Sequence, residues 1–452
     1  MKLTTRLQLS LMMFLEFFIW GAWYVTMGTY ITQALGANGK QLGYSYSAFA
    51  IATIISPFFV GMVADKFFAA QRVLGVLHIL GAALFYYATT LSNPNVFIWI
   101  IFLYSLCYAP TLALVNSVAF RQMGDTTKQF ASIRVLGTLG WIVAGWAITL
   151  IQSYPISPYT DNNWWHKVLN FLMPAGNTIG NFLTSVLKTI DNHFASTNLN
   201  FTFILASIFS LLLGLISFTL PSTPPKAKGT KTTFAQILGV DAFVLFKNRS
   251  FTVFFIASIL ICIPLSFYYS LTNLFLTESG MKDVTFNMTF GQWSEGFFIL
   301  LIPFFFRRLG VKWMIAVGMI AWSIRFLLFG YGDTGPNLWM FFAGIILHGV
   351  CFDFFFVTGQ IYTDSKAEVK IQSSAQGMIT LATYGIGMFI GTILSGVVKD
   401  VFTVDKIVQW KSVWMIPAAI ALAVLIMFVF LFRDKASVTK EPNASSEPAM
   451  AM

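Results

Sequence analysis

The segment that decides the fold is the polar connection "PSTPPKAKGTKTTFAQILGVDAFVLFKNRS" (221–250), which divides a very apolar chain into two comparable halves. It begins with a proline cluster and carries five Lys or Arg residues. On each side of it, apolar runs of about 20 residues recur, the length that crosses a bilayer. Only 10% of the 452 residues are charged, whereas about 25% of a soluble protein is charged. The composition therefore indicates an integral membrane protein.

We predict twelve membrane spans, six on each side of this connection. They cover residues 7–31, 44–64, 73–92, 96–119, 133–153, 201–220, 251–277, 286–306, 313–332, 337–362, 374–398 and 413–432. An even number of spans places both termini on one side. With the termini inside, about nineteen Lys and Arg residues face the inner side and about seven the outer side. Because Lys and Arg gather on cytoplasmic loops, we expect both termini in the cytoplasm.

Similar charged loop segments follow corresponding spans in the two halves. "GMVADKFFAAQR" (61–72) follows the second span and "FFRRLGVKW" (305–313) follows the eighth. Two six-helix repeats joined by a cytoplasmic linker describe the major facilitator architecture. We therefore expect an all-α membrane protein whose twelve transmembrane helices form two six-helix bundles, residues 1–220 and 251–433. The polar tail, 434–452, is expected to be disordered.

The segment 154–200 on the outer side is too polar to span, although its apolar residues recur at helical spacing. Such a pattern is typical of amphipathic helices lying at the membrane interface. A lid over the transport path is the alternative role for this insertion.

Three carboxylates lie inside predicted spans: Glu16, Glu295 and Asp353. Asp353 stands in "LHGVCFDFFFVTG" (347–359), where a carboxylate costs several kcal/mol unless it is paired, protonated or in contact with water. A carboxylate that alternates between an apolar site and a nearby cation can carry a proton. All three are candidates for proton coupling. The alternatives are a permanent pairing that locks helices together and, for Glu16, contact with water near the membrane face.

Two helical faces carry polar groups suited to a substrate. Gln292 and Glu295 share a face of the eighth span at i and i+3. Arg134, Thr138 and Trp141 form a stripe on the fifth span. A guanidinium group, a hydroxyl, an amide and a flat aromatic ring could together bind a compound in which a sugar is joined to a base. Alternatively, Arg134 is a helix-end charge near the inner surface.

The tenth span adds an aromatic stripe, His348, Phe352 and Phe356, at i, i+4 and i+8. It provides a stacking surface for a substrate or, alternatively, packs against lipid. Arg325 in the ninth span is interpreted as an interior structural charge that needs a partner. His78 in the third span is interpreted as a hydrogen-bonded packing residue.

Asp65, Lys66 and Arg72 lie in the loop after the second span. Charges there can pair across the cytoplasmic ends of helices in one conformation and separate in another, so we assign them to gating. The chain contains no GxxxxGK[ST], HExxH or GxSxG motif, and its three cysteines have no metal-binding spacing. We therefore expect no ATP-driven motor, no enzyme activity, no metal and no organic cofactor, with protons as the coupling ion.

The chain resembles the nucleoside:proton symporter family of the major facilitator superfamily, found in bacterial inner membranes. The resemblance covers nearly the whole chain. Its motifs are "FIWGAWYVTMGTY" (18–30), "GMVADKF" (61–67), "YAPTLALVNS" (108–117), "IRVLGTLGW" (133–141), "LGVDAFVLFKN" (238–248), "SEGFFILLIPFF" (294–305), "RFLLFGYGD" (325–333), "FDFF" (352–355) and "SAQGM" (374–378). It implies nucleoside uptake driven by the proton gradient, through a central cavity that opens alternately to each side.

The resemblance carries binding roles to Arg134 and Thr138, to Gln292 and Glu295, and to Phe352 with Asp353, with Trp141 as the aromatic position. The chain also departs from the family pattern. Ser266 and Tyr269 replace amide positions, His348 replaces a tyrosine, Glu16 stands where an amide is frequent, and the outer insertion is longer.

Nucleosides, protons and the lipid bilayer are therefore the expected partners of a monomer that binds no nucleic acid. Two other functions stay open. The cargo could be a sugar or another small polar metabolite, or the protein could be a nutrient sensor that does not transport.

Overall fold

The structure is a computed structural model that describes residues 1–66, 68–123, 126–153, 199–224, 240–368 and 371–433. This part of the chain is almost entirely helical, apart from a short hairpin of β1 (Thr403–Val404) and β2 (Ile407–Val408). It contains ten helical stretches that are long and apolar enough to cross a membrane. The prediction of an all-α membrane protein with many spans is confirmed.

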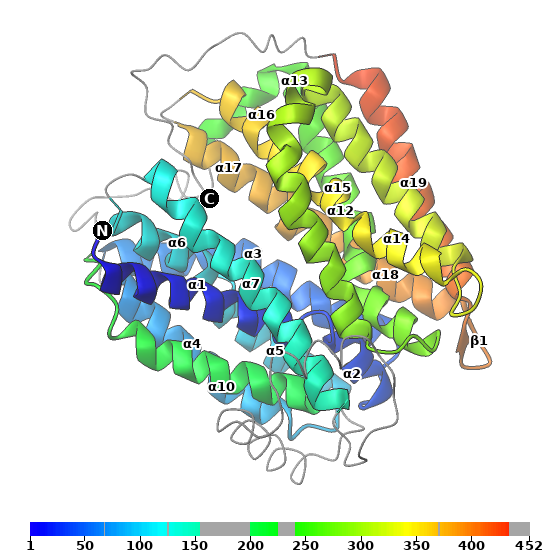
Figure 1. Ribbon diagram of the computed structural model, residues 1–452, viewed down its shortest axis with the longest axis horizontal. Coiled ribbons are helices and arrows are strands. Elements are labelled where there is room, and N and C mark those ends of the chain that lie inside the picture. The colour runs from blue at the N-terminus through cyan, green and yellow to red at the C-terminus, as the bar shows by residue number, and fades with distance from the viewer. Residues whose placement is uncertain (67, 124–125, 154–198, 225–239, 369–370, 434–452) are drawn as a thin grey trace.

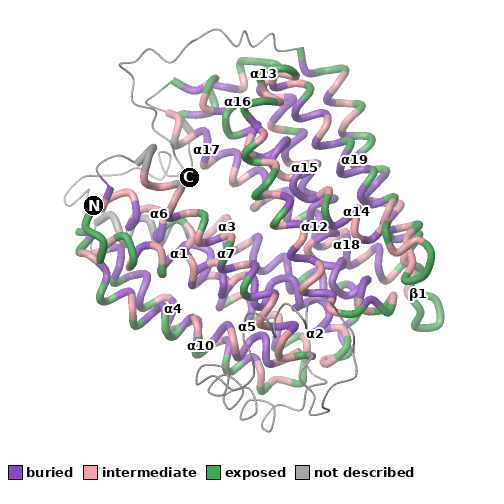
Figure 2. Tube along the Cα trace, in the orientation of Figure 1, coloured by how far each residue is buried: buried purple, intermediate pink, exposed green. Residues whose placement is uncertain are grey.

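The N-terminal half lies on one side of the molecule (Figure 1). Its helices are α1 (Leu3–Trp23), α2 (Met27–Gln33), α3 (Gly39–Lys66), α4 (Ala70–Ala88), α5 (Pro94–Tyr108), α6 (Thr111–Arg121), α7 (Thr126–Ser153) and α10 (Asn200–Ser217). Within it, α1 packs against α7 and α10, and α4 packs against α5 and α10. The buried residues lie mainly between the helices and the exposed ones along the outer faces (Figure 2).

The C-terminal half begins with the 3₁₀ helix Val240–Lys247 and contains α12 to α19. Its helices are α12 (Arg249–Glu278), α13 (Val284–Tyr331), α14 (Leu338–Ile346), α15 (His348–Phe352), α16 (Thr358–Lys366), α17 (Gln372–Thr380), α18 (Met388–Val401) and α19 (Trp410–Leu431). Two π-helical turns, Asp353–Val357 and Leu381–Gly387, interrupt the spans around α15 and α18. In this half α13 packs against α19 and α15, and α12 packs against α18 and α19.

The count of ten differs from the twelve predicted spans at two places, α13 and α3. The 48-residue α13 contains Gly310 with φ 64° and ψ 176°, which is not a helical conformation. Glycine adopts positive φ readily because it lacks a Cβ, so the chain changes direction there. The predicted eighth and ninth spans both fall within α13. The predicted second span falls within α3, part of whose side chains lie outside the described residues.

The first predicted span is interrupted, because α1 ends at Trp23 and α2 begins at Met27. Buried backbone groups that leave a helix need other partners. Tyr46 of α3 supplies them: its hydroxyl donates to the Tyr24 carbonyl at 2.8 Å and accepts from the Gly28 N–H at 3.0 Å. The fourth predicted span is interrupted as well, between α5 and α6, where Pro110 has no N–H to continue the ladder.

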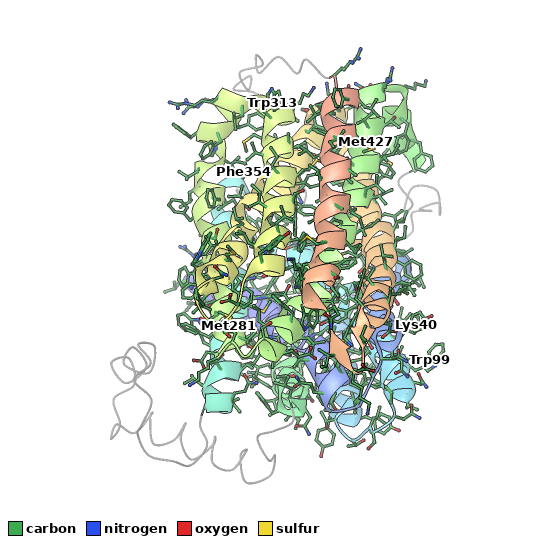
Figure 3. All side chains as sticks on the ribbon, turned by 90° about the vertical axis from the view of Figure 1, so that its right-hand side faces the viewer. Lys40, Trp99, Met281, Trp313, Phe354 and Met427 are labelled. Carbon is green, nitrogen blue, oxygen red and sulfur yellow. The ribbon has the colours of Figure 1, made fainter. Side chains whose placement is uncertain are left out.

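The two halves meet at one end of the molecule. We call this end, which contains Lys40 and Trp99, the far end, and the end near Pro224 and Val240 the linker end. Figure 3 shows Lys40 and Trp99 toward one end and Trp313, just after the Gly310 turn, toward the other.

At the far end, α3 packs against α18, α7 against α13, and α2 against α12. At the linker end, α6 is not extensively packed against α16 or α17 in the described part of the chain (Figure 1).

Among the described residues, three hydrogen-bonded links join the halves at the far end, and we call them the far-end contact. Asp400 of α18 accepts from the backbone N–H groups of Gly39 and Lys40, at 2.5 and 2.9 Å. Thr29 donates to Asn273 at 2.6 Å. The third link is the indole N–H of Trp146, which donates to Thr289 at 3.3 Å.

Some predictions concern residues that the structure does not describe. The proposed amphipathic helices of 154–200 fall on 154–198, and the tail falls on 434–452. Most of the linker, 225–239, is also outside the described residues.

Candidate functional site

Three charged residues from the predicted set come together where α7 and α13 pack. Arg134 lies eight residues after the start of α7 at Thr126, so it is well inside the helix rather than at its end. Its guanidinium lies 4.0 Å from the centroid of the Phe17 ring. Arg134 interacts electrostatically with Glu295 of α13. Within the described ranges the two form no ion pair at 4 Å or less.

Asp353 lies near this pair, at the start of a π-helical turn. Its side chain is fully buried, and neither carboxylate oxygen has a hydrogen-bond partner in the described part of the chain. It interacts electrostatically with Glu295. Single π-helical turns inside α-helices occur frequently at functional sites. A buried carboxylate without a hydrogen-bond donor does not stabilise the fold, because no interaction offsets the free-energy cost of its desolvation.

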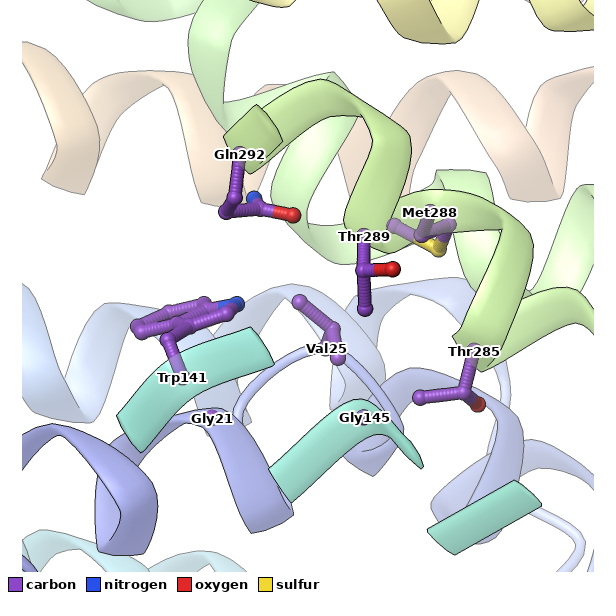
Figure 4. Close-up of a pocket in the computed structure, with 8 residues that line it drawn as sticks. All are labelled: Gly21, Val25, Trp141, Gly145, Thr285, Met288, Thr289 and Gln292. Carbon is purple, nitrogen blue, oxygen red and sulfur yellow. The ribbon is translucent and has the colours of Figure 1, made fainter. Parts of the chain in front are cut away.

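A pocket lies beside this cluster, toward the far end (Figure 4). Its lining comes from the α1–α2 break, α7 and α13, and comprises Gly21, Val25, Trp141, Gly145, Thr285, Met288, Thr289 and Gln292. Figure 4 shows Gln292 of α13 facing the ring of Trp141 of α7. An amide and an indole on opposite walls can hydrogen-bond and stack on one flat polar compound. Thr138 is half-buried one turn before Trp141.

The aromatic stripe of the tenth span faces protein rather than lipid. The His348 and Phe352 rings lie 5.6 Å apart, and the Phe352 and Phe356 rings 4.9 Å apart. His348 is almost completely buried, whereas Phe352 is half-buried. Arg325 is fully buried, as predicted, and its partners are His348 at 3.0 Å and the face of the Tyr268 ring at 3.5 Å.

Glu16 lies away from this cluster, inside the N-terminal half. Its side chain is fully buried, so the alternative that it meets water near the membrane face is wrong. The Glu16 carboxylate contacts His78 of α4 at 2.8 Å and accepts from Thr111 of α6 at 2.6 Å. His78 in turn contacts the Ser210 hydroxyl of α10 at 3.0 Å. The interpretation of His78 as a hydrogen-bonded packing residue is confirmed.

Three tyrosines lie near the site; Tyr24 and Tyr384 were not predicted, whereas Tyr269 was noted from the sequence at a position where the family has an amide. Tyr24 and Tyr269 pack edge to face, with ring centroids 5.5 Å apart across the two halves. Tyr384, in the second π-helical turn, interacts electrostatically with both Arg134 and Glu295. A phenol hydroxyl inside an apolar run was the signal that could have identified them. Ser266 instead points away, donating to the Cys262 carbonyl at 2.8 Å.

The predicted gating residues are only partly described. Asp65 and Lys66 end α3, and their side chains lie outside the described residues. Arg72 is exposed in the first turn of α4. Their role stays a prediction.

Comparison with known proteins identifies the family. The model of the nucleoside H⁺ symporter family matches residues 1–164 and 174–437. The chain belongs to the nucleoside H⁺ symporter family. This symporter is 38% identical to the putative nucleoside transporter YegT of Escherichia coli over 95% of this chain and 94% of YegT. It is 31% identical to the nucleoside permease NupG of Escherichia coli over 95% of this chain and 96% of NupG.

Solved structures agree with the sequence comparison. The crystal structure of the nucleoside transporter NupG matches with a TM-score of 0.79 at 29% identity, covering 96% of this symporter and 100% of that chain. A POT family transporter matches with a TM-score of 0.66 at 12% identity, which shows a shared fold alone. Membership of a family of permeases makes the protein a transporter and not an enzyme.

Proposed function

We propose that this symporter imports nucleosides together with protons across the bacterial inner membrane. The observation that carries the proposal is the cluster of Arg134, Glu295 and Asp353 in a member of a nucleoside H⁺ symporter family, with the Gln292 and Trp141 pocket beside it. In this proposal Gln292, Arg134 and Thr138 bind the ribose and base through hydrogen bonds. Trp141, Phe352 and His348 enclose the flat base.

The proton carrier is Asp353, Glu295 or both, with Glu16 as a third candidate. A buried carboxylate without a donor is costly, and binding a proton removes its charge. When substrate or a conformational change brings a cation near, the proton leaves. One proton entering down a membrane potential of about 100 mV releases about 2.3 kcal/mol, enough for a roughly 50-fold concentration ratio of substrate.

Transport follows by alternating access of two six-helix bundles with the major facilitator fold. Counting α13 as two spans on either side of Gly310, and adding α3 to the ten apolar stretches, gives twelve. The clustering of Lys and Arg near the linker end supports the proposal that this end, and both termini, face the cytoplasm. The far-end contact then closes the outer side, and Asp65, Lys66 and Arg72 gate the inner side. We propose that the monomer is the transporting unit.

The test is uptake into proteoliposomes that contain the purified full chain. An imposed inward proton gradient should drive accumulation of labelled uridine or adenosine above equilibrium, and an uncoupler should abolish it. Unlabelled nucleosides should compete with the label. Competition by sugars alone would favour another cargo, and binding without accumulation would favour a sensor; either result refutes the proposal.

A further inference from the structure

Arg325 of α13 is a buried charge that the proposed transport cycle does not use. It is fully buried, and no carboxylate lies within 4 Å of it in the part of the chain that the structure describes. Its Nη1 lies 3.0 Å from Nδ1 of His348. The guanidinium carbon lies 3.5 Å from the centroid of the Tyr268 ring. The Nε and Nη2 groups of Arg325 have no hydrogen-bond partner among the described residues.

In the hydrogen bond between Arg325 and His348, only Arg325 can be the donor. A guanidinium group carries donors and no acceptor, so Nη1 donates and Nδ1 must accept. The tautomer with its proton on Nδ1 would remove that acceptor, and the doubly protonated imidazolium would in addition place two cations in contact. His348 is therefore neutral and carries its single ring proton on Nε2. Parallel stacking of its ring on Tyr268, with centroids 5.1 Å apart, fixes the orientation.

The Nε2–H group of His348 is left without a partner from the chain. It makes no hydrogen bond among the described residues. The Nε2 atom is also not among the completely buried nitrogen and oxygen atoms that lack a partner. His348 does not line the pocket itself but lies next to residues of the candidate site. The half-buried Phe352 ring lies 5.6 Å away, and the Cβ of His348 packs against Gly291, the neighbour of the pocket residue Gln292.

We propose that Arg325 fixes His348 as a hydrogen-bond donor in the substrate site, so that a transported compound must present an acceptor to Nε2. A carbonyl oxygen or an unprotonated ring nitrogen of a nucleobase meets this requirement. The inference rests on the proposed function, because it assigns a selectivity to the same site. Arg325 acts as a positioning residue and does not touch the substrate. Among the described residues, the charged and titratable groups near His348 are Arg325 and Glu295 of α13, Tyr268 of α12 and Cys351 of α15, with Asp353 of the π-helical turn near Glu295.

The test is competition for uptake by the full chain in proteoliposomes. Adenosine and uridine are compared with analogues in which one ring nitrogen or carbonyl acceptor at a time is removed. Wild type should prefer the parent over one analogue by about tenfold, the value of one hydrogen bond. His348→Phe, which keeps a ring but has no donor, should lose this preference. His348→Gln, which keeps an N–H donor, should retain part of it.

The Arg325 variants test the positioning role. Arg325→Met should lose the preference, because the ring proton is then free to move to Nδ1. The competition should also become pH-dependent between about pH 5 and pH 7, where a released imidazole titrates. Arg325→Lys, which can still donate to Nδ1, should restore most of the preference.

Preference that survives in His348→Phe would overturn the inference, even where Arg325→Met does not fold. An Arg325→Met protein with wild-type preference and no pH dependence would also overturn it. Uptake of no nucleoside by wild type would instead refute the proposed function.

Discussion

Removing the Asp400 carboxylate should loosen the far-end contact without damaging either half. Asp400 belongs to α18 of the C-terminal half, and the two N–H groups that it accepts from begin α3 of the N-terminal half. The first N–H groups of a helix have no partner within the helix, so a carboxylate there acts as a cap. Because this cap comes from the other half, its stabilisation favours the conformation in which the far end is closed.

The size of the effect follows from the two hydrogen bonds. Replacing a capping Asp by Ala costs about 0.5–2 kcal/mol. Lys40 is exposed, so water can replace the lost acceptor there. We expect the loss of the Asp400 carboxylate to destabilise the closed far end by about 1 kcal/mol, which raises the ratio of open to closed conformations about fivefold. Thr29–Asn273 and Trp146–Thr289 remain, so the closed conformation should still dominate.

The measurement is the rate at which a thiol reagent labels Val25→Cys in detergent, with the three native cysteines replaced. Val25 lines the pocket behind the far-end contact and is 6% exposed. If opening and closing are fast, the labelling rate reports the open population. Asp400→Ala should raise this rate about fivefold, by the 1 kcal/mol derived above.

The matched control is Asp333→Ala. Asp333 also accepts from two backbone N–H groups, those of Gly335 at 2.7 Å and Asn337 at 3.0 Å, but all three belong to one loop of the C-terminal half. These donors, that of Asn337 first, lower the pKa of the Asp333 carboxyl. The control should leave the labelling of Val25→Cys unchanged. An unchanged rate in Asp400→Ala, or an equal rise in both variants, would refute the capping mechanism.

Three further variants test separate parts of the proposal. Asp353→Asn should abolish proton-driven accumulation in proteoliposomes while substrate exchange survives; accumulation with an unchanged pH profile would remove Asp353 as the carrier. Glu16→Gln should keep both thermal stability and coupling, because its amide can donate to His78 and still accept from Thr111; loss of coupling would assign the carrier role to Glu16. Gly396→Ala should open the far end more than Asp400→Ala, because its Cβ would overlap the Gly39 carbonyl oxygen, and normal labelling of Val25→Cys would contradict this.

The sequence predicted the spans well because each is a local apolar run, but their interruptions depend on partners elsewhere in the chain. Nothing near Met27 indicates that α2 starts there. The break is compatible with burial because the Tyr46 hydroxyl satisfies the backbone on both sides of it. Pro110 was a visible signal for the second break. The Gly310 turn was predicted as a loop between two spans.

In the candidate site, too, local features could be predicted from the sequence and contacts between distant residues could not. Its charged residues were visible because ionisable groups are rare in apolar runs. The partners of these charged residues could not be predicted from the sequence, since His78 is 62 residues from Glu16 and His348 is 23 residues from Arg325. Tyr24 and Tyr384 were missed because a phenol inside an apolar span is also compatible with ordinary packing. The π-helical turn at Asp353 has no sequence signal that we can identify.

The partners of the buried charges separate two kinds of residue. Glu16 and Arg325 each have their hydrogen-bond partners within one half of the molecule, so a movement of the halves against each other leaves those contacts intact. Arg134 belongs to the N-terminal half, whereas Glu295 and Asp353 belong to the C-terminal half. Alternating access changes contacts between the halves far more than contacts within them. Only the second group therefore has surroundings that differ between the two conformations, which a proton carrier requires. We therefore propose that Glu295 and Asp353 couple protons to transport, and that Arg134 is the cation whose approach releases these protons.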